Sequence, residues 1–165
     1  MLICLHHHLA TNKRGAAAAE MALVLPLLVT LLFGSFEVGK YFLDAHRVQQ
    51  AVRDGARFAG RQGFVDMPCG GTATADPQIK NLVRTGTTAS GGTPRLTYWT
   101  NPATITVTIT CDSTGTYSAA GIYTIVSGGA RRVTVNATVP YDSLLGMRLT
   151  GANINARSES AVMGI

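Results

Sequence analysis

The stretch that decides the fold is Gly15–Phe36, GAAAAEMALVLPLLVTLLFGSF, in which Glu20 is the one charged residue. As an α-helix with a rise of about 1.5 Å per residue, it would be about 33 Å long, enough to cross a bilayer. A buried helix of a soluble protein would be shorter, and a surface helix would carry a polar stripe that this segment lacks. The segment therefore predicts a transmembrane helix, with a local kink or unwound turn at Pro26, because proline lacks the N–H of an intrahelical bond.

An amphipathic pattern follows and continues this helix beyond the span. Apolar residues recur at spacings of three and four, and they are Val38, Phe42, Ala45, Val48, Val52, Ala56 and Ala59. The opposite face carries Lys40, Asp44, Arg47, Arg53, Asp54, Arg57 and Arg61. Glycines at positions 60 and 63 favour a helix end there. The pattern predicts one continuous helix from Ala16 to Arg61.

The remainder of the chain is rich in Thr, Gly and Ser and predicts a small β-rich domain. Strict alternation of apolar and polar residues marks 103–111 (ATITVTITC) and 131–139 (RRVTVNATV) as strands. The other expected elements are a short helix at 76–84, a strand near Tyr123 and Ile125 that turns at Gly128–Gly129, a helix or turn around Leu144 and Leu145, and a last strand at 152–163.

The expected fold class is α+β, a long N-terminal transmembrane-plus-stalk helix followed by a small antiparallel β-rich domain. The expected segments are a basic leader (1–15), a transmembrane helix (16–37), an amphipathic stalk helix (38–62) and an extracytoplasmic domain (63–165). Cys4 precedes the apolar run, whereas Cys69 and Cys111 follow it, so a membrane would leave an even pair on the oxidising side. A Cys69–Cys111 disulfide is therefore expected, and two buried free thiols are the alternative.

Other signals do not point to a site. The net charge of +5 comes from scattered basic residues, so nucleic-acid binding is not expected. The adjacent pair Arg131 and Arg132 opens a predicted strand, where both side chains are expected to be solvated. His6–His8 with Cys4 lie in the leader, and His46 is the only other histidine, so a Ser-His-Asp site in the C-terminal region is not available. We expect no enzymatic activity, catalytic residue, cofactor or metal.

Three blocks, Arg14–Glu20, the apolar Met21–Leu28 and Val52–Arg57, together resemble the N-terminal signature of TadE-like proteins. These are prepilin-like components of the Tad/Flp tight-adherence pilus system. In that family a basic leader ending in glycine is removed by a prepilin peptidase, and a glutamate stands fifth in the mature chain. The resemblance implies cleavage between Gly15 and Ala16, which makes Glu20 the fifth residue.

The role implied for Glu20 is subunit assembly. A carboxylate inside an apolar helix costs roughly 2.5–3.5 kcal/mol near the bilayer centre and usually has a partner. The implied partner is the freed N-terminal amine of another pilin-like subunit, and the alternative is that Glu20 sits among the lipid headgroups. Met21 stands where the major Flp pilin usually has tyrosine, and the C-terminal domain is too large for that short subunit. A minor pilin or pseudopilin fits better.

The resemblance also implies a location and partners. These are a single pass through the bacterial inner membrane, a periplasmic C-terminal domain at the base of a pilus or in its filament, and contacts with pilin-like subunits, the Tad secretion machinery and prepilin peptidase. Basic residues flanking the span do not support this orientation, but the long C-terminal region and the cysteine placement favour it. The main rival is an uncleaved signal-anchor protein whose periplasmic β domain binds a ligand. A secreted protein is disfavoured, because no small-x-small cleavage site follows residues 21–33.

Overall fold

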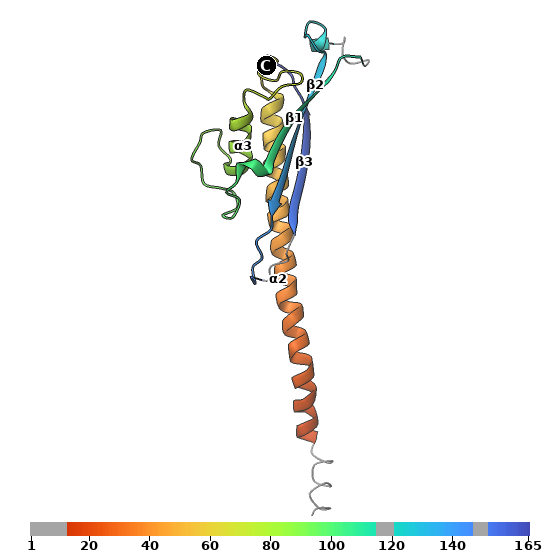
Figure 1. Cartoon of the computed structure of the whole chain (residues 1–165). Coiled ribbons are helices and arrows are strands. Elements are labelled where there is room, and N and C mark those ends of the chain that lie inside the picture. The colour runs from red at the N-terminus through yellow and green to blue at the C-terminus, as the bar shows by residue number, and fades with distance from the viewer. Residues whose placement is uncertain (1–12, 115–120, 147–151) are drawn as a thin grey trace, which may run out of the picture. The chain divides into compact units, whose positions relative to one another are not determined.

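The computed structural model describes residues 13–114, 121–146 and 152–165 of the chain (Figure 1). Two compact units follow one another along the sequence, Met1–Lys40 and Tyr41–Ile165. The first helix, α2 (Lys13–Gly60), supplies the described part of the first unit and continues into the second. The functional boundaries expected at residues 15, 37 and 62 remain predictions.

In the first unit, α2 stays α-helical through Pro26. The unwound turn, one of the two distortions expected there, is therefore absent from the described residues 13–40. Proline removes only one N–H donor from the hydrogen-bond ladder, and the apolar helix formers on both sides keep their own bonds. The hydroxyl of Thr30 also donates to the Pro26 carbonyl oxygen, with an oxygen–oxygen distance of 2.8 Å.

The second unit combines the rest of α2 with a short helix and one sheet. Its further elements are α3 (Asp76–Thr85), the 3-10 turns η1 (Pro102–Thr104) and η2 (Gly121–Tyr123), and the strands β1 (Ile105–Asp112), β2 (Ala130–Pro140) and β3 (Asn153–Ala161). The sheet is antiparallel with the order β1-β2-β3. The α+β prediction is confirmed, as are the short helix and the three strands at 103–111, 131–139 and 152–163.

The strand expected near Tyr123 and Ile125 is wrong. Described residues 121–129 form η2 and turns, and the Ile125 side chain is 92% exposed. The connection ends at Gly128 and Gly129, both with positive φ, which suits a turn rather than a strand. Because β1 pairs directly with β2, this segment is a connection between neighbouring strands and not a sheet member.

The core of the second unit lies between the sheet and α2. In β2, the side chains of Val133, Val135 and Val139 are fully buried, as alternation predicts. Facing residues on α2 are also buried, namely Val48, Ala51, Val52, Ala56 and Ala59, and Met67, Ile79, Val83 and Trp99 complete the cluster. β1 alternates as expected, although only Ile105 is fully covered.

Two stalk residues reverse their expected positions. The Phe42 side chain, expected inward, is 66% exposed, whereas Asp44, expected outward, is buried. The Tyr98 hydroxyl donates to Asp44 Oδ2 at 2.9 Å, so the carboxylate gains a partner inside the domain. Burial, followed by this hydrogen bond, raises the pKa of Tyr98 above its ordinary value. Helical periodicity does not reveal a polar residue that is paired by a distant tyrosine.

Candidate assembly helix and loop clamp

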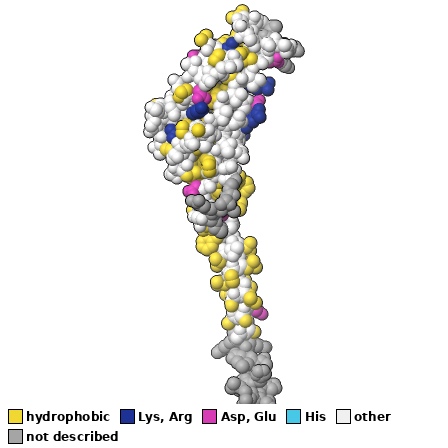
Figure 2. All heavy atoms as spheres, in the orientation of Figure 1, with side chains coloured by type: hydrophobic (Ala, Val, Ile, Leu, Met, Phe, Trp, Pro, Cys, Tyr) yellow, Lys and Arg dark blue, Asp and Glu magenta, His cyan; other side chains and the backbone are white. Residues whose placement is uncertain are grey.

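The N-terminal part of α2 is apolar all round and exposed all round. Figure 2 shows the hydrophobic side chains along it. The large exposed ones are Met21, Leu23, Val24, Leu25, Leu27, Leu28, Val29, Leu31, Leu32, Phe33 and Phe36. The most apolar window of the helix has no buried residue, and its length and composition suffice to cross a membrane. A helix of this kind is stable only where lipid or other apolar helices cover it.

Gly15, Ala16 and Glu20, the residues expected to act in processing and assembly, lie on the first turns of this exposed helix. A Cβ atom added at Gly15 would meet nothing within 4 Å. Glycine in a helix costs roughly 0.5–1 kcal/mol relative to alanine, and here no packing contact in the described chain requires it. The Glu20 carboxylate makes no ion pair with the described residues. Within the described residues, Gly15 therefore fills no close-packed position and Glu20 makes no ion pair.

The later block, Val52–Arg57, has a different role, because it packs the second unit together. Val52 and Ala56 are buried, and a Cβ atom added at Gly55 would collide with the Val83 side chain of α3. Asp54 Oδ2 lies 3.0 Å from Arg95 Nη2 in a half-exposed ion pair. Gly55 is a position that sequence reasoning missed, since nothing local says that α3 crosses the helix there.

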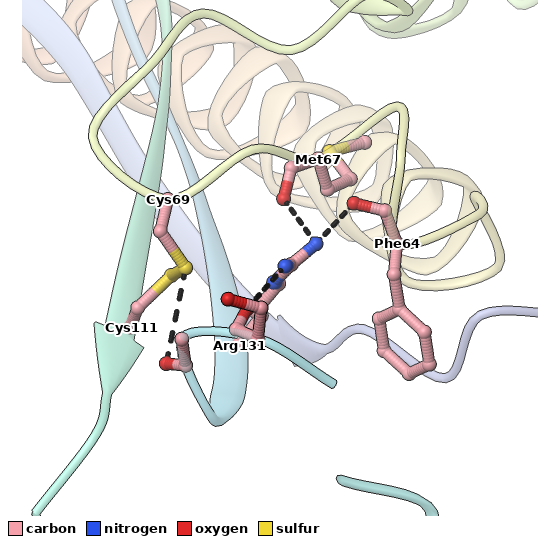
Figure 3. Close-up of a disulfide and its surroundings, with 7 residues drawn as sticks. Phe64, Met67, Cys69, Cys111 and Arg131 are labelled. Atoms are coloured by element: carbon pink, nitrogen blue, oxygen red, sulfur yellow. Dashed lines mark hydrogen bonds between the residues drawn. A yellow bond between two sulfur atoms is a disulfide. The ribbon is translucent and has the colours of Figure 1, made fainter. Parts of the chain in front are cut away.

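Cys69 and Cys111 form a disulfide, with Cα atoms 5.8 Å apart (Figure 3). The bond ties the loop after α2 to the end of β1. Beside it lies Arg131, the second residue of β2, whose guanidinium points toward the same loop (Figure 3). Nη1 of Arg131 donates to the carbonyl oxygens of Phe64 and of Met67, the latter at 3.0 Å.

The same guanidinium makes two further contacts. Its Nη2 donates to the Ser127 carbonyl oxygen at 2.8 Å, and its central carbon lies 5.5 Å from the centre of the Phe64 ring. We call Arg131 and the Cys69–Cys111 disulfide the loop clamp. The expectation that Arg131 is solvated is wrong, whereas Arg132 is indeed exposed. The alternation of side chains along the strand could have predicted this burial, because Arg131 and Val133 lie two residues apart and share the face that packs on the core.

The described residues contain no group of three or more His, Cys, Asp or Glu side chains that could hold a metal ion. A hollow of about 550 Å³ lies beside the disulfide and is lined by residues of β1, β2, β3 and η2. Asp112 is the one carboxylate in its lining, and no histidine lines it. His46 lies on the exposed side of α2, where its ring contacts the Gln50 side-chain amide at 3.0 Å.

Comparison with known protein families finds a match to part of the chain. The family model described as TadE-like protein matches residues 15–57. The searches of curated proteins and of solved structures found no match. The matched region begins at Gly15 and contains the exposed apolar helix with Glu20. It ends at Arg57, the last residue of the block Val52–Arg57 that packs the second unit together. Residues 15–57 of the chain are therefore similar to TadE-like proteins.

Proposed function

We propose that this chain is a non-enzymatic pseudopilin or minor pilin, required for assembly of Tad/Flp-type pili and for surface adherence. The observation that carries the proposal is the fully exposed apolar helix inside the TadE-like match at residues 15–57. Such a helix needs lipid before assembly and other apolar helices after it, and a pilin-like subunit moves between these two environments.

Two residues have proposed roles in this cycle. Prepilin peptidase cleaves between Gly15 and Ala16, and the open surroundings of Gly15 support a role outside the fold, because the described chain has no packing need for glycine there. Glu20 then pairs with the new N-terminal amine of a neighbouring pilin-like subunit. The absence of an ion-pair partner among the described residues leaves its carboxylate available for that contact.

The proposed location is the bacterial inner membrane, crossed once by residues 16–37, with the stalk 38–62 and the domain 63–165 in the periplasm. The disulfide supports this orientation, because such bonds persist in oxidising compartments. The partners in this proposal are the inner membrane, prepilin peptidase, the Tad secretion machinery and other pilin-like subunits.

The first test is the mass of the protein isolated from membranes of piliated cells. Wild type and a Gly34→Leu control, another α2 glycine with nothing within 4 Å of an added Cβ, should both start at Ala16. Gly15→Leu should retain the leader, because only glycine lets the peptidase reach the backbone. A wild-type chain that starts at Met1 in piliated cells would instead favour the uncleaved signal-anchor protein.

The second test separates assembly from folding. Glu20→Gln should be inserted, processed and folded, since the change lowers the cost of placing the helix in lipid. It should nevertheless fail to co-purify with pilin-like subunits and should abolish piliation. Normal piliation by Glu20→Gln would contradict the assembly role of this carboxylate.

A further inference from the structure

The exposed face of α2 in the second unit carries three arginines at intervals of four residues. We call them the arginine stripe, and they are Arg53, Arg57 and Arg61. Arg53 and Arg57 lie one helical turn apart, a spacing that places Cβ atoms about 5–6 Å from each other. Arg61 follows in the turn that closes α2, where its backbone N–H donates to the Phe58 carbonyl oxygen at 3.2 Å. The three side chains therefore form a row of cations along one side of the domain.

The fold itself does not use these guanidinium groups. None of the three makes an ion pair or a side-chain hydrogen bond with the described residues. The nearest acidic residue in the sequence, Asp54, is paired with Arg95 at 3.0 Å. Cations stabilise the C-terminal turn of a helix, which accounts for Arg57 but not for Arg53, about two turns before the end of α2. A role outside the described chain is left for the stripe.

Two open hollows meet at Arg57, which lines both of them. The first, of about 390 Å³, is lined by Gln50, Arg53, Asp54 and Arg57. The second, of about 400 Å³, adds Arg61 and two exposed apolar side chains, those of Met163 (52%) and Ile165 (82%). The Met163 N–H donates to the Gly60 carbonyl oxygen at 2.8 Å, which fixes this segment beside α2. We call the two hollows together with the stripe the arginine groove.

The chemistry of the arginine groove matches an acidic and partly apolar protein segment. A guanidinium group binds a carboxylate through two parallel hydrogen bonds, and a helix with carboxylates one turn apart repeats the spacing of the stripe. Met163 and Ile165 favour a protein over a polyphosphate chain, because they can pack only on apolar groups. Arginine and methionine are also enriched at protein interfaces.

A second copy of the domain does not supply such a segment. Within residues 41–165, no two acidic residues lie within four positions of each other. Asp54, Asp76 and Glu159 are in addition already paired with basic side chains of the same domain. The occupant of the groove is therefore a different protein.

We propose that the arginine groove binds an acidic amphipathic helix of a different protein subunit, whose carboxylates lie one turn apart beside apolar side chains. This inference goes beyond the proposed function, because the contact lies in the second unit and uses neither Gly15 nor Glu20. Complementary charge mainly sets which partner binds and how fast it binds, so the groove selects a partner for the domain.

The test is photo-crosslinking in the native host, with the full chain carrying a photoreactive amino acid at position 50. Gln50 is exposed and lines the groove, and Val65, which is 91% exposed and lines neither hollow, is the control position. The groove variant is Arg53→Glu/Arg57→Glu. The matched control variant, Arg132→Glu/Arg157→Glu, changes the net charge equally at side chains that are 68% and 66% exposed. Thermal unfolding followed by circular dichroism checks that both variants stay folded.

We expect position 50, but not position 65, to form an adduct with a different protein at a segment that has carboxylates three or four residues apart. The groove variant should lower the adduct yield about tenfold or more, whereas the control variant should retain it. Changing the partner's two carboxylates to arginine should restore the adduct with the groove variant.

Several results would overturn the proposal. They are an adduct with a second copy, with lipid or with a segment that lacks carboxylates, equal losses for the groove and control variants, a yield that neither variant changes, and no adduct at position 50. Failure of the charge exchange to restore binding would also overturn it. All of these results would leave cleavage at Gly15 and the assembly role of Glu20 to be decided by their own tests.

Discussion

Replacing Arg131 with methionine should strongly destabilise the second unit. The substitution removes three hydrogen bonds, to the carbonyl oxygens of Phe64, Met67 and Ser127, and the contact with the Phe64 ring. At about 1 kcal/mol net per hydrogen bond and about 0.5–1 kcal/mol for the ring contact, the free energy of unfolding should fall by roughly 3–4 kcal/mol.

The assay is thermal unfolding of the full-length protein in detergent micelles, followed by circular dichroism. For a unit of this size, the loss should lower Tm by roughly 10 °C or more. The neighbouring variant Arg132→Met is the matched control, because its side chain is 68% exposed and only approaches Glu159, at 3.6 Å. An exposed ion pair contributes about 0–1 kcal/mol, so the control should shift Tm by a few degrees at most. Equal shifts for the two variants would refute the buried role of Arg131.

The disulfide sharpens this prediction, because it ties down the same loop. By the loop-entropy estimate, replacing both Cys69 and Cys111 with serine should cost about 4 kcal/mol. Without the disulfide, the loop can move into water and its carbonyl groups become hydrated. Arg131→Met should therefore lower the free energy of unfolding less in the double-serine variant than in the disulfide-bonded protein. Strictly additive losses would show that the two halves of the loop clamp act independently.

Two further predictions concern contacts that α2 makes, with α3 at Gly55 and with Tyr98 at Asp44. Gly55→Ala should lower the free energy of unfolding, measured by denaturant titration, by about 1–3 kcal/mol, because the added Cβ would collide with Val83. The control Gly39→Ala, whose added Cβ would meet nothing within 4 Å, should be neutral or stabilising. A neutral Gly55→Ala would contradict the close approach of α3. The pKa of Tyr98 is higher in the folded than in the unfolded protein, so the unfolded tyrosine loses its proton at a lower pH. The contribution of Tyr98 to the free energy of unfolding is therefore fully present below pH about 10 and is lost as the pH rises further. Tyr98→Phe, which lacks this proton and the bond to Asp44, should flatten the alkaline decline of Tm, and parallel pH profiles for wild type and variant would rule that out.

The sequence by itself determined the elements whose signal is local. The apolar run 15–36, with Glu20 as its one charge, and the amphipathic residues after it specify a long helix, because side-chain direction along a helix follows directly from spacing. Strict alternation likewise located β1 and β2, and Asp76-Pro77 located the start of α3. The roles of Gly15 and Glu20 depend on a peptidase and a neighbouring subunit, so they stay predictions.

Tertiary structure alone decided what depends on residues far apart in the chain. Arg131 is buried because the loop at residues 64–67, more than sixty positions earlier, presents carbonyl groups to it. Asp44 is buried because Tyr98 reaches it, and Gly55 is needed because α3 crosses there. A local pattern predicts which face of a helix or strand a side chain occupies, but not which residues pack against that face. Those packing residues determine whether a buried charge, or a glycine in place of a larger residue, stabilises the fold.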